Sequence, residues 1–276
     1  VQTVNSRMAV VTKKGKRFDT SGRVLYGPVN TNNVFRGFGG ACEQRNNGDA
    51  VVRYDQLANR WLIVMPTFSR AEARPDQPPV WTASDKPYAS PPGRRDQPGA
   101  AAPLYQPSAS ARPEAGELRR DLAVAASGRE GGPALPALPA LTGPYSMCYA
   151  VSTTSDPLGA YYRYEFLRPL FPDYPRPAVW PDGYYVPTST GDEVIEKHAC
   201  VVERDALLAG KPAREQCFVI NDVNFLNNAD LDGRALPRRG APNLMLAAGG
   251  TQLKQDLDDD VVLAWKFFTD WRDPSR

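Results

Sequence analysis

The sequence has a single histidine and four cysteines, so most catalytic and metal-binding patterns are missing from it. A serine or cysteine nucleophile needs a base, normally histidine, and His198 lies in a predicted strand beside Cys200, where we expect a structural role. No GxSxG, HExxH or phosphate-binding glycine loop occurs, and no two cysteines form a CxxC pair. The lone histidine cannot complete a zinc site of the usual spacing.

The sequence also lacks a large excess of charge of one sign and long apolar runs. The 33 basic and 31 acidic residues leave a net charge of +2, which gives no reason to expect nucleic acid or an anionic membrane as partner. No apolar run reaches the length of about 18 residues that spanning a bilayer requires. The first residue is Val1 and no leader precedes it, so we expect that a signal peptide has been removed or that the chain is an excerpt.

The four cysteines are Cys42, Cys148, Cys200 and Cys217. Cys200 and Cys217 flank a segment that can fold back on itself, which predicts a disulfide between neighbouring strands. Cys42 and Cys148 would form the second disulfide. The alternative is four buried thiols in a cytosolic protein. We favour disulfides, and therefore a secreted or periplasmic protein.

Short runs of β-forming residues separated by turn residues occur along most of the chain and predict an all-β fold. We interpret Ser146 to Thr190 as the outer half of one sheet followed by the inner half of the next. Helical turns are predicted at Glu203 to Gly210 and at Pro113 to Ala126. The other predicted strands are Val1 to Thr12 (as two strands), Val24 to Tyr26, Ala50 to Tyr54, Trp61 to Thr67, His198 to Val202, Gln216 to Asn221, Asn243 to Ala248 and Asp260 to Thr269.

Residues 69–144 differ in composition from the rest of the chain. They hold 14 of the 27 prolines, and PALPALPAL occupies positions 133–141. Such a segment buries too little apolar surface to offset its ordering entropy. We predict a low-complexity insertion within one domain that comprises residues 1–276, with an interdomain linker as the alternative. Limited proteolysis is expected to cut first between Ala71 and Leu141.

Two segments share one layout, which predicts a repeated unit. GDAVVRYDQLANRWLIVMPT and DYPRPAVWPDGYYVPTST each run strand, Asp-containing turn, aromatic, strand. Without the insertion, Trp61 and Tyr184 lie about 50 residues apart, the length of a four-stranded propeller blade. We predict a β-propeller of four-stranded antiparallel blades, about three of them in this chain. Such a ring cannot close, so we expect self-association or a missing remainder of the chain to complete it.

The segments GDAVVRYDQLANRWLIV, CYAVSTTSDPLGAYYRYEF and FPDYPRPAVWPDGYYVPTS resemble exported bacterial β-propeller proteins, related in layout to sialidase-like and arabinanase-like propellers. The resemblance covers most of the chain outside the insertion and implies the fold, but no activity. The turn TTSDPLGAYY is similar to the sialidase Asp-box, S-x-D-x-G-x-x-W, although Gly159 follows Asp156 by three positions and tyrosine replaces tryptophan. In sialidases this box supports folding, so the likeness implies no catalysis.

Carboxylates are the remaining catalytic candidates. In propellers, ligands usually meet the axis, where the innermost strand of each blade begins, and here these positions fall near Asp49, Asp173 and Asn243. A glycosidase needs two carboxylates about 5 to 10 Å apart, which makes Asp49 and Asp173 candidate catalytic residues. The competing interpretation is that both are ordinary turn residues. We take Asn243 as a candidate ligand-binding residue.

Trp180 and Asp182 are two further candidate ligand-binding residues. Together with Pro181 they match the general-acid loop of tyrosine phosphatases, but no cysteine is followed by arginine at the C-x5-R spacing that those enzymes need. Phosphatase activity is therefore excluded.

Asn228, Asp230 and Asp232 have the oxygen-ligand spacing of the start of an EF-hand-like calcium loop. Position twelve of that loop would be Arg239, which cannot supply the bidentate carboxylate. A plain acidic surface turn is the favoured interpretation, and calcium is the one cofactor that we consider. The sequence thus predicts an exported propeller module that binds a glycan or a protein surface. The alternative is a glycan-cleaving hydrolase that uses carboxylates at the axis.

Overall fold

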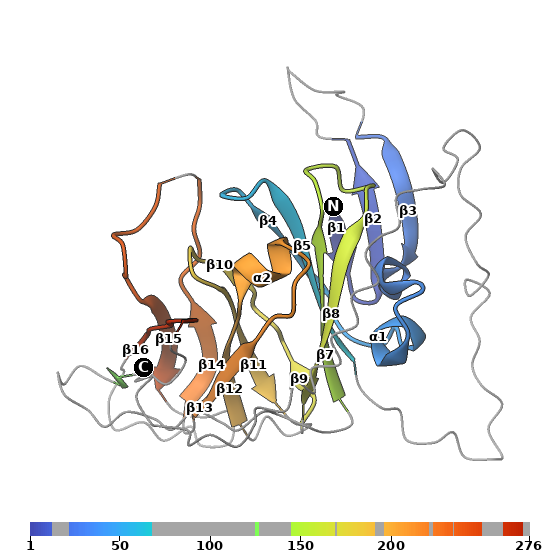
Figure 1. The fold of residues 1–276 in the computed structure, drawn as a ribbon. Coiled ribbons are helices and arrows are strands. Elements are labelled where there is room, and N and C mark those ends of the chain that lie inside the picture. Colours follow the sequence, from blue (N-terminus) through green and yellow to red (C-terminus); the bar gives the residue numbers. More distant parts are fainter. Residues whose placement is uncertain are drawn as a thin grey trace, which may run out of the picture.

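The computed structural model describes residues 1–12, 22–67, 125–126, 145–168, 170–190, 196–220, 223–233, 235–249 and 262–272. This part of the chain is all-β, with antiparallel sheets of three to five strands and three short helical segments (Figure 1). The strands are β1 (Gln2–Val4), β2 (Arg7–Val11), β3 (Val24–Asn30), β4 (Val51–Asp55), β5 (Arg60–Thr67), β6 (Ala125–Ala126), β7 (Tyr145–Ser152), β8 (Tyr161–Arg168), β9 (Pro172–Asp173), β10 (Ala178–Val179), β11 (Tyr184–Thr190), β12 (Glu196–Val202), β13 (Glu215–Ile220), β14 (Val223–Asn228), β15 (Asn243–Gly249) and β16 (Val262–Phe267). The helical segments are η1 (Thr31–Phe35), α1 (Gly40–Gln44) and α2 (Arg204–Leu208).

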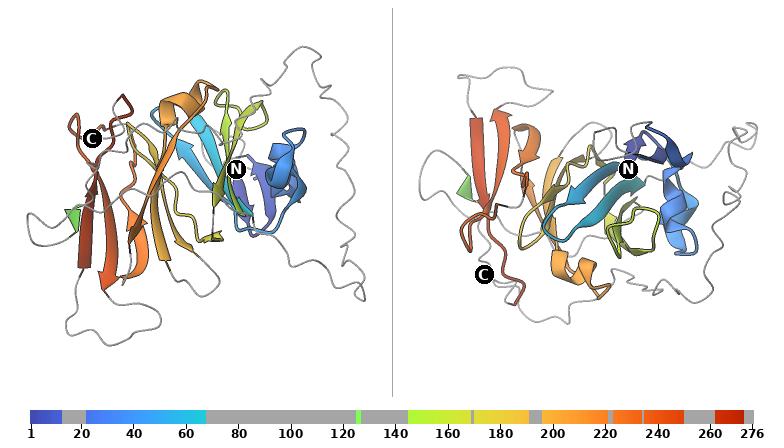
Figure 2. Two further views of the ribbon diagram at one scale, coloured as in Figure 1. Left: turned by 60° about the horizontal axis from the view of Figure 1, so that its bottom comes forward. Right: turned by 90° about the horizontal axis from the view of Figure 1, so that it is seen from above.

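The strands form four antiparallel sheets that follow one another along the chain. The first sheet has the order β1-β2-β3, the second β4-β5-β7-β8, the third β10-β11-β12-β13 with β9 also paired to β11, and the fourth β14-β15-β16-β6. Most hydrogen-bonded neighbours in a sheet also follow each other along the chain. The exceptions are two short strands, β6, which pairs with β16, and β9, which pairs with β11. In both Figure 1 and Figure 2 the sheets lie side by side in chain order, from the blue first sheet to the red fourth sheet.

Three buried clusters hold the consecutive sheets together. Neighbouring residues of β5 point to opposite faces, so Ile63 packs towards the first sheet while Leu62 packs towards the third. This double burial explains why β5 is a nearly continuous apolar run. The cluster between the third and fourth sheets includes Tyr185, Phe218 and Phe267, whose rings meet edge to face.

The hairpins form where the sequence predicts turns. In the turn between β4 and β5, Oδ1 of Asp55 accepts the backbone N–H groups of Leu57 (3.0 Å) and Ala58 (2.9 Å). The turn between β10 and β11 needs Gly183, because a Cβ atom there would lie 2.3 Å from a methyl group of Val201. In the turn between β7 and β8, Asp156 plays the same part as Asp55 by accepting the backbone N–H of residue 158.

Both expected disulfides are present. Cys200 and Cys217 lie directly opposite each other on β12 and β13, with their Cα atoms 4.1 Å apart. Cys42 in α1 is bonded to Cys148 in β7, with a Cα separation of 5.8 Å. The two disulfides fit an exported protein. None of the helices in the described part of the chain has the length and apolar character needed to cross a membrane.

The segment 30–47 is rich in glycine and asparagine, and it contains η1 and α1. Asparagine side chains hold it together: the backbone N–H of Asn32 donates to Oδ1 of Asn46 (3.1 Å), and Nδ2 of Asn32 donates to the carbonyl oxygen of Glu43 (2.6 Å). The carboxylate of Glu43 accepts the N–H groups of Gly37 and Gly39 (2.8 and 2.6 Å).

The predicted insertion lies outside the described residues, apart from β6. The strands that flank it, β5 and β7, are direct neighbours in the second sheet, with Leu62 opposite Val151. The predicted helical turn from Pro113 to Ala126 also lies outside the described residues except for its last two positions, which form β6.

Candidate functional site

The two candidate catalytic carboxylates lie near each other. Asp49 is exposed just before β4, and Asp173 is half-buried in β9 of the adjacent sheet. Burial raises the pKa of Asp173, and the negative charge of Asp49 raises it further, while the backbone N–H of Tyr174 and the charge of Arg176 act in the opposite direction. Asp49, just before β4, and Asp173, in β9, are thus within electrostatic reach of each other.

An aromatic and cationic cluster lies beside Asp173. The guanidinium of Arg176 stacks against the rings of Tyr174 and Phe225, at 5.6 and 5.1 Å from their centroids. It also donates a hydrogen bond of 3.1 Å to the carbonyl oxygen of Leu226. Tyr174 is 59% exposed and adopts a φ of 50°, and its N–H donates to Asp173 Oδ1 at 2.8 Å. We call Asp49, Asp173, Tyr174, Arg176 and Phe225 the first-strand surface.

A groove of about 730 Å³ lies between the third and fourth sheets. The turn between β10 and β11 forms one side of it, and the connection between β14 and β15 and the residues after β16 form the rest. Two tryptophans, two prolines and several charged side chains line it. The lining residues are Trp180, Pro181, Asp182, Asp205, Leu236, Pro237, Arg238, Arg239, Gly240, Ala241, Thr269, Asp270, Trp271 and Arg272.

Two indole N–H groups hold the walls of the groove in place. Trp180 Nε1 donates to the carbonyl oxygen of Ala241 (3.0 Å), at the end of a tight turn in which Ala241 N donates to Arg238 O (2.9 Å). Trp271 Nε1 donates to the carbonyl oxygen of Asp182 (2.6 Å). Because both indoles tie one wall of the groove to another, its shape is set before any ligand arrives.

Asp182 is a half-buried carboxyl group in the groove. Its Oδ1 accepts a hydrogen bond from the Tyr185 hydroxyl (3.2 Å), which also lies 3.1 Å from Thr269 Oγ1. Burial raises the pKa of Asp182, and the hydrogen bond from Tyr185 offsets only part of that effect. Trp180 and Asp182 are both candidate residues from the sequence, and in the structure they line the same groove.

Asn243 is not part of either surface. It is fully buried as the first residue of β15, and its Nδ2 donates to the carbonyl oxygen of Ala229 (2.8 Å). Sequence reasoning places Asn243 at the start of an innermost strand, but the first strand of the fourth sheet is β14, which that reasoning does not predict. Asn243 shapes the connection that forms one wall of the groove.

The residues of the calcium candidate make other contacts. Asn228 Nδ2 donates to the carbonyl oxygen of Tyr185 (2.8 Å). Asp230 Oδ1 accepts the N–H of Val179 (2.8 Å), and its Oδ2 lies 3.7 Å from Arg53 Nε. Asp232 is exposed, and no trio of ligand side chains within the described ranges includes it or Asp230. These contacts join the third sheet to its neighbours.

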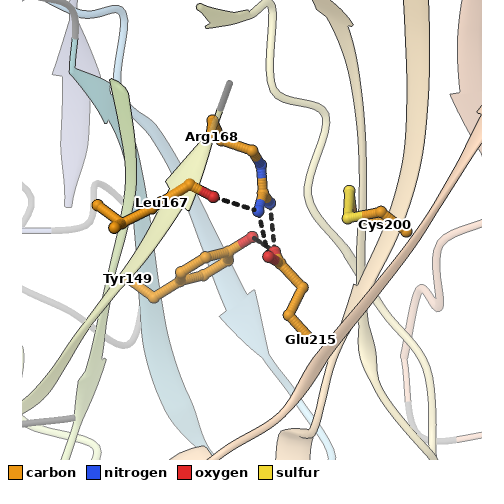
Figure 3. Close-up of a disulfide and its surroundings, with 6 residues drawn as sticks. Tyr149, Leu167, Arg168, Cys200 and Glu215 are labelled. Atoms are coloured by element: carbon orange, nitrogen blue, oxygen red, sulfur yellow. Dashed lines mark hydrogen bonds and ion pairs between the residues drawn. A yellow bond between two sulfur atoms is a disulfide. The ribbon is translucent and has the colours of Figure 1, made fainter. Parts of the chain in front are cut away.

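The described trio that does have metal-ligand spacing is Cys200, Glu215 and Cys217. Both sulfur atoms belong to the disulfide, so neither can act as a thiolate ligand. Figure 3 shows what Glu215 does instead: it forms a two-pronged ion pair with Arg168, and Tyr149 donates to the same carboxylate (3.3 Å). With its side chain 1% exposed, Arg168 offers no surface to a ligand.

His198 and Asp55 are buried for structural reasons as well. His198 is 1% exposed within β12. Asp55 accepts hydrogen bonds from Arg204 Nε (2.7 Å) and from the Tyr184 hydroxyl (2.8 Å). This contact ties the hairpin of the second sheet to the third sheet and to α2.

Sequence reasoning misses part of each surface. Trp271, Arg238 and Arg239 of the groove lie outside the predicted strands. The one sequence signal for the groove wall formed by these residues is the Arg238-Arg239-Gly240 triplet, because glycine favours a turn there. Tyr174 follows β9 of the third sheet and Phe225 lies in β14 of the fourth, so their contact depends on how those two sheets pack.

Comparison of the chain with models of protein families, with curated proteins and with solved structures finds no match. The geometry of the groove and of the first-strand surface is therefore the basis for a proposal about function.

Proposed function

We propose that this protein is an exported, non-enzymatic module, built as a β-propeller or part of one, that binds a glycan in the groove between its third and fourth sheets. The observation that carries this proposal is the groove itself. It combines two indole side chains with a carboxyl group and guanidinium groups, in walls already held by hydrogen bonds.

Sheet order supports the propeller part of the proposal. Antiparallel sheets follow one another along the chain, and each buries a face against the next. The first strands of the second and third sheets, β4 and β10, lie close to each other, and the first strand of the fourth sheet, β14, lies against β11. Propeller blades also follow one another along the chain and pack face to face, so these contacts support the proposal of a propeller. The two disulfides support export to a secreted or periplasmic location.

A sugar ring has apolar C–H faces and a hydroxyl-bearing edge, so it needs a flat apolar surface beside a few polar groups. We assign this role to the part of Trp271 that lines the groove, and Arg214, 5.4 Å from the ring centroid, helps to hold the indole in place. Asp182, Arg238 and Arg239 supply hydrogen-bonding groups around it. Binding sites for small molecules typically combine an apolar lining with a few polar groups in this way.

Glycan-array screening followed by calorimetry tests the proposal. Trp271→Ala should weaken binding of the best glycan at least about tenfold, since roughly 1.4 kcal/mol of stacking is lost, whereas Trp271→Phe should retain most of it. Phe225→Ala, on the first-strand surface, is the matched control. Full-strength binding by Trp271→Ala, or loss of binding in Phe225→Ala alone, would show that the groove is not the site.

Glycan hydrolysis is the second candidate function, because Asp49 and Asp173 lie within electrostatic reach and burial raises the pKa of Asp173 as a general acid requires. If the protein cleaves a polysaccharide, Asp173→Asn should abolish turnover while Asp182→Asn should leave it intact. Absence of turnover across a broad polysaccharide panel would eliminate this alternative.

A further inference from the structure

We infer that the groove selects an anionic glycan, one that carries a carboxylate, sulfate or phosphate group, and that Arg238 and Arg239 bind this group. The inference rests on the proposed glycan binding and adds the class of ligand. It comes from the pairing of the charged groups in the groove, from the way the two arginines are held, and from the geometry of guanidinium groups.

Most charges in the groove already have partners. Arg272 makes two contacts with Asp270, Nε to Oδ1 at 3.2 Å and Nη2 to Oδ2 at 3.3 Å. Asp205 lies 3.6 Å from Arg204. Asp182 accepts a hydrogen bond from a neutral tyrosine hydroxyl.

Arg238 and Arg239 are different, because neither has a carboxylate partner among the residues that the structure describes. Both are exposed and both line the groove. The wall that carries them therefore presents two positive charges to whatever occupies the groove, while the carboxyl group of Asp182 lies in a different wall and is bonded to a neutral hydroxyl. An anionic ligand would be drawn to this wall, and the attraction would weaken with added salt.

The backbone that carries these arginines is fixed, unlike that of a typical surface pair. Arg238 and Arg239 occupy the first two positions of the tight turn that Ala241 N closes onto Arg238 O. Gly240 at the third position has a φ of 76°, as a type II turn requires. The indole of Trp180, which is 8% exposed, holds the end of this turn through the Ala241 carbonyl.

Guanidinium groups suit the ligand that we infer. Each presents parallel N–H donors that match the oxygens of a carboxylate, sulfate or phosphate. A sugar stacked on Trp271 would place a charged substituent towards one wall of the same groove. The inferred site therefore joins an aromatic platform to an anion-binding turn.

The test uses matched pairs of probes on the full chain: a galacturonate trimer with its carboxyl-reduced form, and a heparin hexasaccharide with its desulfated, N-acetylated and carboxyl-reduced form, so that the second member of each pair is neutral. We expect at least one acidic member to bind about tenfold or more tightly than its neutral counterpart. The double variant R238A/R239A should abolish that preference, because it should weaken binding of the acidic member about tenfold or more beyond any loss for the neutral member. R238K/R239K should restore part of the preference, because charge returns without the planar fork. Lys266→Ala is the control, because it removes an exposed positive charge that does not line the groove, and it should leave the preference unchanged.

Three outcomes would overturn the inference. Equal binding of both members of each pair would refute charge selection while leaving glycan binding intact. An acidic probe that binds Trp271→Ala as tightly as wild type, and that no longer binds at about 0.2 M salt, would be held only by non-specific electrostatic attraction. Failure of every probe and every arrayed glycan to bind would refute the proposed function as well.

Discussion

At the scale of single residues, buried charged side chains form contacts that join one sheet to the next. Asp55 is fully buried, and every contact described for its carboxylate is with a donor from its own turn, from Tyr184 or from Arg204. The guanidinium of Arg204 also lies over the Tyr184 ring, 5.9 Å from its centroid. Such a site is sensitive to the loss of either partner, because a single remaining charge would be buried without compensation.

Replacing Asp55 with alanine should therefore destabilise the protein by about 3 to 5 kcal/mol, since Arg204 would stay buried without its partner. Urea unfolding measures this change. Asp205→Asn is the matched control, because Asp205 contacts the same guanidinium from an exposed position and should change the unfolding midpoint little. Equal effects of the two variants would contradict the structural role given to Asp55.

The same carboxylate predicts a pH dependence. Burial alone would raise the pKa of Asp55, but hydrogen bonds and the positive charge of Arg204 outweigh burial and lower it. Because the folded pKa lies below the unfolded value of about 3.9, the stabilisation is complete above that value and is lost as the pH falls through the folded pKa. Between about pH 5 and pH 2, wild-type stability should fall more steeply than that of Asp55→Asn. If the unfolding free energies of the two proteins, measured with urea, fall in parallel with pH, the pKa of Asp55 is not lowered by folding.

At the scale of elements, the sequence predicts what depends on neighbouring residues. The strands and hairpins follow from alternating apolar residues and from turns such as the one that Asp55 closes, and they are observed within a few residues of their predicted ends. The sequence does not predict the helical segments η1 and α1 or the strand β14. The first two depend on contacts such as that of the Asn32 N–H with Asn46 Oδ1. Half of β14 is asparagine, which is typical of turns, and the strand forms through its pairing with β15.

The two disulfides connect elements over very different lengths of chain. Cys200 and Cys217 are 17 residues apart, and Cys42 and Cys148 are 106 apart. In the chain-entropy model these loops correspond to about 3 and about 4.7 kcal/mol. Replacing both members of the longer pair with alanine should therefore lower the free energy of unfolding more than replacing the shorter pair. Denaturant unfolding of the two double variants decides this, and the reverse order would mean that native contacts of the cysteines outweigh loop entropy.

At the scale of the whole molecule, the arrangement of sheets determines what the sequence can predict about function. Trp180 and Asp182 lie in one turn, so a local pattern identifies them together. Trp271 and Arg238 reach the same groove from other segments, and only the packing of the fourth sheet on the third brings them there. Asp49 and Asp173 belong to the two segments of similar layout, and the charge of Asp49 raises the pKa of Asp173, but their catalytic role stays a prediction.

The three inter-sheet clusters also predict how stability is distributed. Each cluster joins two consecutive sheets, so a perturbation should spread mainly to adjacent sheets, as in a linear array of repeats. Phe267→Ala empties a fully buried site between the third and fourth sheets, and Phe35→Ala does the same between the first and second. Each should cost about 3 to 5 kcal/mol. In native-state hydrogen exchange, Phe267→Ala should accelerate exchange in β11 to β16 and spare β1 to β3, and Phe35→Ala should do the opposite. Uniform acceleration by both variants would show instead that the four sheets open as one cooperative unit.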